Sequence, residues 1–275
     1  LPLTWSGFLV PHGVTQNQFK LELTNSIRKL VSSLGTAKAR RETGLFMAEG
    51  TKCVTDTIHS FSPQYSFATQ NWIDENGAML MGVAEPVIVK RADMARMSQL
   101  TTPPEIIAVY SIPDIVLDRQ RLQTSLTLAL DRVQDPGNLG TIIRIADWMG
   151  VKDILCTFDT VDVYNPKVIQ ATMGAISRVR VHYVNLQTVL SEMSPLPVFG
   201  TFLDGENIYT KRLPTSGIVV MGNEGNGISD DIGRMVTDRL FIPPYPLGQT
   251  TSESLNVAVA TAITLSEFRR QHANM

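Results

Sequence analysis

The sequence has little cysteine and no long hydrophobic run. Its only two cysteines, Cys53 and Cys156, are far apart and do not form a CxxC pair. They provide neither a disulfide framework nor a zinc site and are typical of a reducing compartment, so we expect a cytoplasmic protein without a bound metal. The absence of any run of about 18 apolar residues argues against a membrane-spanning helix. Residues 1–15 lack a signal-peptide pattern, and we expect them to be a tag or a disordered leader.

The sequence also lacks an excess of positive charge, because its formal net charge is −2 at pH 7. Since phosphates attract cations, this balance alone argues against a nucleic-acid partner. The cations are unevenly distributed, however. Residues 20–49 contain six cations and three anions, and the densest cluster is Lys38, Arg40 and Arg41. Taken alone, such a cluster is more typical of a solvated helix end than of a binding site.

The pattern along the chain indicates two parts. With 43% apolar and 18% charged residues, the composition is that of a packed globular protein. Residues 16–112 alternate short helical and strand-like runs, which predicts a compact α/β module. Its predicted helices are 25–34 and 54–61, and its predicted strands are 45–48, 87–89 and 106–110. Residues 113–125 begin with a proline and carry several charges, and we interpret them as a linker.

Residues 126–275 alternate buried-looking strands with helices. The predicted strands are residues 126–130, 153–156, 179–184, 198–203, 218–221 and 239–242. Nearly continuous apolar strands separated by helices are typical of a mostly parallel sheet covered on both faces, so we predict an α/β fold. The last helix is expected to begin near Ser252, because Thr250 and Glu253 have the spacing of a capping box.

Ligands of open α/β sheets bind in the loops after the strands, and three such loops are rich in turn and polar residues. The first, residues 131–140, contains the turn signal Asp135-Pro136-Gly137. Asn138 follows at a position where a helix N-cap is expected, so its side chain has either a capping or a chemical role. Arg144 lies among apolar neighbours in the helix that follows, and a cation in such a segment indicates a specific role.

The second loop, residues 220–229, has three glycines in six positions directly after a strand. Gly222 and Gly225 allow the backbone to approach a ligand closely. The spacing is GxxGxG with Glu224 inside it. A dinucleotide-binding oxidoreductase would instead show GxGxxG, and a bound phosphate would be repelled by the acid. An acidic, glycine-rich loop fits a neutral nucleoside or a cationic sulfonium better.

The third loop, residues 242–256, is stiffened by three prolines and leads into the last helix. The free backbone N–H groups of a helix start are ready donors. For Ser254 or Asn256 taken singly, capping is the simpler interpretation.

In this order and at these spacings, the three loops resemble the three signature motifs of the SpoU/TrmH branch of the SPOUT methyltransferases. The resemblance covers residues 126–270. The first part of the chain resembles the ribosomal-protein-like RNA-binding domain that precedes the catalytic domain in many members. Residues 38–50 have the sequence that is typical of that domain.

The resemblance implies an enzyme that transfers a methyl group from S-adenosylmethionine to a ribose 2′-hydroxyl of structured RNA, with ribosomal RNA favoured over transfer RNA. It also implies a homodimer and a deep trefoil knot near the C-terminus, a feature that periodicity could not have predicted. The alternative is an RNA-binding or ribosome-assembly factor of the same fold without catalysis. Such a factor would have lost residues at the Arg144, Glu224 or Asn256 positions, and all three are present.

The same resemblance implies roles for individual residues. The catalytic set is Asn138, Arg144, Glu224, Ser254 and Asn256. The residues around S-adenosylmethionine are Thr201, Leu203, Gly222, Asn223, Gly225, Ile242 and Leu255. RNA phosphates would contact Lys38, Arg40 and Arg41. The chain departs from typical members in a longer loop at residues 243–254, where Tyr245 either stacks on a base or is a plain surface residue.

Overall fold

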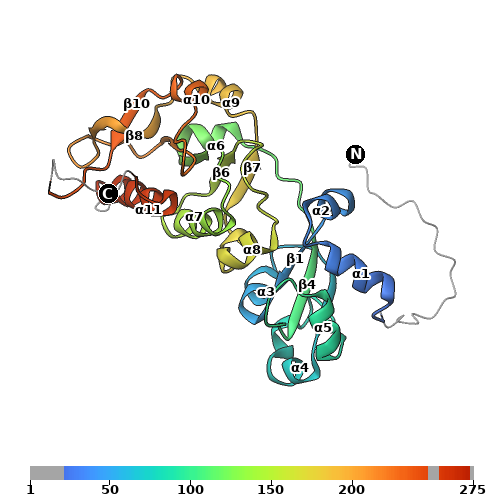
Figure 1. Ribbon diagram of the computed structural model, residues 1–275. Coiled ribbons are helices and arrows are strands. Elements are labelled where there is room, and N and C mark those ends of the chain that lie inside the picture. The colour runs from blue at the N-terminus through green and yellow to red at the C-terminus, as the bar shows by residue number, and fades with distance from the viewer. Residues whose placement is uncertain (1–21, 247–253, 273–275) are drawn as a thin grey trace, which may run out of the picture.

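The computed structural model describes residues 22–246 and 254–272, which contain two β-sheets (Figure 1). The first sheet has the order β1-β4-β2-β3, in which β4 is antiparallel to β1 and β2. Its strands are β1 (Leu45–Glu49), β2 (Pro63–Ala68), β3 (Val87–Ile88) and β4 (Ile106–Ser111). Around it lie α1 (Asn25–Ser33), α2 (Ala37–Thr43), α3 (Thr51–Thr57), α4 (Gln70–Asn76), η1 (Gly77–Leu80) and α5 (Arg91–Met97).

The second sheet has six strands in the order β10-β8-β9-β5-β6-β7, and every neighbouring pair is parallel. The predicted parallel α/β fold is therefore confirmed. The strands are β5 (Leu126–Leu130), β6 (Asp153–Cys156), β7 (Arg180–Tyr183), β8 (Val198–Asn207), β9 (Gly217–Met221) and β10 (Asp238–Phe241). The helices are α6 (Arg119–Thr124), α7 (Pro136–Trp148), α8 (Pro166–Thr172), η2 (Ala175–Ser177), α9 (Leu186–Glu192), α10 (Asp230–Gly233) and α11 (Val257–Arg270).

Helices cover both faces of the six-stranded sheet, as continuous apolar strands require. Leu128 and Leu130 of β5 point to the face covered by α7, α8 and α11, whereas Ala129 packs on the opposite side with α6, α9 and α10. Figure 1 shows these two helical layers on opposite sides of the sheet. This arrangement leaves the carboxyl ends of the strands, with their loops, as the accessible edge.

The two parts of the chain share one continuous core. Helix α8 packs against β1 of the first sheet, and the rings of Phe46 and Tyr164 lie 4.7 Å apart between their centroids. Cys53 of α3 is buried in the same cluster as Ile169 of α8. Burial of this apolar surface holds the first part of the chain at one position on the second.

Two local features differ from the expectations. Six residues of the expected linker form α6, which Asp118 caps and whose Leu122 is fully buried. The last helix begins at Val257 with Asn256 as its N-cap, so the prediction of a start near Ser252 was wrong. The capping pair Thr250 and Glu253 lies outside the described residues.

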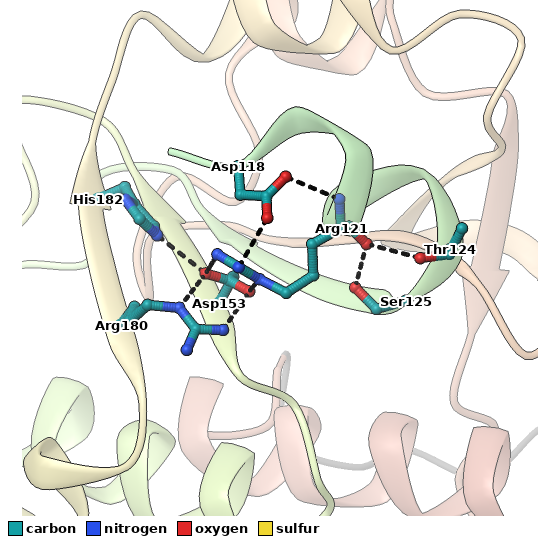
Figure 2. A network of polar contacts seen from close by, with 7 residues as sticks. All are labelled: Asp118, Arg121, Thr124, Ser125, Asp153, Arg180 and His182. Carbon is teal, nitrogen blue, oxygen red and sulfur yellow. Dashed lines mark hydrogen bonds and ion pairs between the residues drawn. The ribbon is translucent and has the colours of Figure 1, made fainter. Parts of the chain in front are cut away.

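A network of charges closes the amino-terminal edge of the six-stranded sheet, opposite the loops (Figure 2). Asp153, only 2% exposed at the start of β6, accepts hydrogen bonds from Arg121, Arg180 and His182 at 2.7 to 3.1 Å. Arg121 belongs to α6 and also contacts Asp118. The buried carboxylate therefore ties α6 to β6 and β7.

Candidate active site

A cavity of about 510 Å³ opens at the carboxyl edge of the six-stranded sheet, between the ends of β8, β9 and β10 and the start of α11. Its walls include Glu224 and Ser254 from the predicted catalytic set. They also include every residue predicted to surround the methyl donor, namely Thr201, Leu203, Gly222, Asn223, Gly225, Ile242 and Leu255. These residues meet because parallel strands end at one edge.

The loop after β9 is a tight ring closed by its own backbone. Asn223 and Gly227 exchange two backbone hydrogen bonds of 3.0 and 2.9 Å, and the Asn223 side chain accepts from the N–H groups of Gly225 and Asn226. A Cβ atom at Gly222 would lie 2.2 Å from the carbonyl carbon of Gly227. Glycine is therefore required at position 222 for the ring to close, which is what lets this loop form a cavity wall.

Three residues from the three predicted motifs form one chain of hydrogen bonds. The Asn138 amide donates to Glu224 Oε1 at 2.7 Å, and the Asn256 amide donates to Asn138 Oδ1 at 2.9 Å. Asn256 Oδ1 in turn accepts from the N–H groups at the start of α11. Because Glu224 can only accept when ionised, the chain has one direction, and it fixes the orientation of both amides.

The Asn138 side chain is free for this contact because another residue caps α7. Asp135 accepts the Asn138 backbone N–H at 2.7 Å and is the N-cap, so the capping interpretation of Asn138 was wrong.

Two side chains position these loops, and one of them, Asp131, was not among the residues expected from the sequence. Asp131, buried directly after β5, accepts the backbone N–H of Ser229 at 2.7 Å and so holds the loop after β9 to the loop after β5. Asn223 donates its amide to the Arg132 carbonyl at 2.8 Å and adds a second link. The only sequence signal for Asp131 is its place directly after a buried strand.

Arg144 does not join this cluster within its own chain. It is exposed on α7 on the same face as Thr141 and Trp148, and it does not line the cavity. Within the described ranges 22–246 and 254–272, its guanidinium has no hydrogen-bond or ion-pair partner. A chemical role for Arg144 therefore needs a group that these described ranges do not contain.

The predicted RNA-contact cluster divides into exposed and buried members. Lys38 and Arg41 are exposed. Arg40 is only 2% exposed, pairs with Asp162 of the second part at 2.6 Å and donates to the Leu34 carbonyl at 2.8 Å. Because its donors are already held inside the interface, Arg40 is not accessible to RNA, and its role is to join the two parts of the chain.

Comparison with protein families identifies this arrangement. The pattern of the SpoU rRNA Methylase family matches residues 125–266, which is more than half of the chain. The chain belongs to the SpoU rRNA methylase family. The pattern of an MRM3-like substrate binding domain matches residues 25–108, which include three strands of the four-stranded sheet and the start of β4.

Relatives of this SpoU-family chain extend along most of its length. It is 31% identical over 240 residues to the 23S rRNA (guanosine(2553)-2′-O)-methyltransferase RlmP of Bacillus subtilis, covering 86% of this chain and 93% of the relative. A solved structure of a putative RNA methyltransferase of the TrmH family from Porphyromonas gingivalis is 37% identical, with a TM-score of 0.78 over 91% of this chain and 100% of that one. An AdoMet-bound rRNA methyltransferase from Sinorhizobium meliloti is 28% identical, with a TM-score of 0.78 over 90% and 96% of the two chains.

The part of this SpoU-family chain that the structure describes contains neither a metal-binding group nor a membrane-spanning helix. No group of three or more His, Cys, Asp or Glu side chains there has an arrangement that could hold a metal ion. No helix there is long and apolar enough to cross a membrane.

Proposed function

We propose that this chain transfers the methyl group of S-adenosylmethionine to a ribose 2′-hydroxyl of ribosomal RNA. The observation that carries the proposal is the hydrogen-bonded chain Glu224–Asn138–Asn256, which joins three distant segments beside one open cavity. The family and the named activity of the Bacillus subtilis relative support the reaction and the class of RNA.

The cavity fits S-adenosylmethionine in chemistry and in volume. At about 510 Å³ it lies within the usual range of small-molecule sites. Ile242 and Leu255 offer apolar walls, and the glycine-rich ring at Gly222 allows close approach to the backbone. Glu224 places a carboxylate beside the cavity, which suits a cationic sulfonium and not a phosphate. When bound, S-adenosylmethionine supplies the methyl group as an electrophile.

The side chains divide the remaining work between orientation and charge. Asn138 and Asn256 hold Glu224 in place through their hydrogen bonds. Glu224 or the hydroxyl of Ser254 relays the proton of the ribose 2′-hydroxyl toward solvent, since both line the cavity. A guanidinium stays protonated and is a poor base, so Arg144 stabilises the developing alkoxide or binds the adjacent phosphate.

A homodimer would bring Arg144 to the site. Arg144 lies on an exposed face of α7 with Trp148, which is 88% exposed, and Val259 of the neighbouring α11 is also exposed. An exposed apolar patch of this kind marks an interaction surface. Light scattering should give a mass near twice 30.3 kDa, and Trp148→Glu should lower the mass toward 30.3 kDa. A wild-type mass of one chain would contradict the dimer.

The remaining proposals concern the surroundings of the site. Lys38 and Arg41 would contact phosphates of the substrate RNA. Residues 16–112 would form the substrate-binding domain and residues 126–275 the catalytic domain, joined by residues 113–125.

A trefoil knot would require the path of residues 247–253, which lie outside the described residues. Two free buried thiols, Cys53 and Cys156, support action in the reducing cytoplasm.

Methyl mapping tests the activity directly. Purified protein is incubated with radiolabelled S-adenosylmethionine and total RNA from a host that lacks this gene. We expect label in one ribosomal RNA, at a single nucleotide that resists alkaline cleavage. Label in transfer RNA would overturn the choice of substrate. RNA binding without label and without donor binding would favour the non-catalytic assembly factor.

A further inference from the structure

Phe158 places an aromatic ring in solvent at the same edge as the candidate active site. It follows β6 by two residues, and its side chain is 71% exposed. Since β6 is parallel to β5, the loops after both strands leave the sheet side by side. A single exposed apolar side chain needs no explanation by itself. The contacts of the residues next to Phe158, however, indicate a function for its exposure.

Hydrogen bonds fix the loop of Phe158 to the catalytic loops. The Thr157 backbone N–H donates to the Leu130 carbonyl at 3.1 Å, and Thr157 Oγ1 accepts the Arg132 backbone N–H at 2.9 Å. The Arg132 carbonyl accepts the Asn223 amide, one residue before Glu224. The loop that carries Phe158 is therefore tied to the loop that carries Glu224 by a short series of hydrogen bonds through Arg132.

Arg132 has a backbone conformation that is unusual for its residue type. Its φ is +60°, in the left-handed region that disfavours side chains. Such strain concentrates at functional sites. Its Nε is buried and has no hydrogen-bond partner within the described part of the chain, and it lies 3.4 Å from Asp131 Oδ1. The side chain is about one-third exposed, so the guanidinium has donors available to a ligand.

We propose that Phe158 and Arg132 form a subsite for a nucleotide that flanks the methylated one. Phe158 stacks on its base, and Arg132 binds its phosphate. The exposed carboxylate of Asp159 adjoins Phe158 and would repel a phosphate there, so the base occupies that position. Aromatic stacking of unpaired bases is a general means of holding single-stranded RNA. The inference rests on the proposed function and adds the segment of substrate that its site contacts.

Binding of RNA to a Phe158→Ala variant tests the stacking. The probe is large-subunit ribosomal RNA from cells without this gene, at one fixed salt concentration. We expect a loss of affinity of about 5- to 150-fold. Phe158→Trp should restore binding, and donor affinity should be unchanged in both variants. Val116→Ala removes an equally exposed apolar side chain from the linker and serves as the control. Unchanged affinity of Phe158→Ala would overturn the proposal.

Arg132→Gly separates binding from folding. Glycine adopts a positive φ without strain, so the variant should unfold at the same temperature as the wild type or higher. Its RNA affinity should fall, and the dependence of affinity on salt should decrease by about one phosphate contact. A lower unfolding temperature with unchanged RNA affinity would assign Arg132 a structural role and would exclude it from the proposed nucleotide subsite.

The proposed function and the subsite can fail separately. If the wild type binds ribosomal RNA but methylates none, the proposed reaction fails, whereas weaker binding by Phe158→Ala still supports the subsite. If the wild type methylates ribosomal RNA and Phe158→Ala has the same KM for it, only the subsite fails.

Discussion

Replacing Arg144 with alanine should lower the single-turnover rate of methyl transfer by about 100- to 1,000-fold, the usual cost of removing one preorganised charge from a transition state. The change should leave folding intact, because Arg144 is exposed and has no partner in the described part of its own chain. Donor binding should also persist, since Arg144 does not line the cavity. Single-turnover assays with labelled donor and the mapped RNA measure the rate, and calorimetry measures donor affinity.

Two further variants make the Arg144 result specific. Arg144→Lys keeps the charge but loses the planar fork, so its rate should remain well below that of the wild type. Arg212→Ala removes another exposed arginine and should leave the rate unchanged. A near-normal rate for Arg144→Lys would show that a point charge suffices, and a near-normal rate for Arg144→Ala would remove Arg144 from the catalytic set.

Strands of the second sheet are predictable where they are nearly continuous apolar runs between polar loops, as in β5 and β9. The observed bounds of β5 and β6 coincide with the predicted ones, residues 126–130 and 153–156. Strand β8 continues to Asn207, four residues beyond the predicted end, because its last residues pair with β10 after a register shift. These residues are polar and partly exposed. Pairing of that kind leaves no hydrophobic pattern in the sequence.

The site was predictable to the extent that it lies in loops at one edge of a parallel sheet. Contacts between distant segments were not. Arg40 looked like a member of a surface cluster because its partner, Asp162, is 122 positions away. Asn138 looked like a helix cap, although Pro136 at the first helical position favours Asp135 as the N-cap of α7. For Arg40 a local pattern was overruled by a tertiary hydrogen bond, whereas for Asn138 the true cap belongs to a local pattern as well.

Asp153 should be the carboxylate on which the stability of the catalytic part depends most. Burial raises the pKa of Asp153, but hydrogen bonds from His182, Arg180 and Arg121 outweigh it, so the pKa lies well below its usual range. In the unfolded chain an Asp titrates near about 3.9. The folded state therefore binds fewer protons at Asp153, and its contribution is complete above that pH and is lost as the pH falls below it.

Asp153→Ala should lower the free energy of unfolding by about 3 kcal/mol, the low end for a buried ion pair that loses one partner. The low end applies because Arg121 and Arg180 keep about one-third of their side-chain surface in water. Urea unfolding measures the loss. Between pH 5 and pH 3, a range that spans the pH of about 4 at which an unfolded Asp titrates, the stability of the variant should decrease less than that of the wild type. Asp204→Ala removes an exposed carboxylate from its pair with Arg239 and should change little. If the two alanine variants lost equal stability, the network at Asp153 would contribute no more than a surface ion pair, and α6 would be held by the burial of Leu122 and the Arg119–Glu192 ion pair.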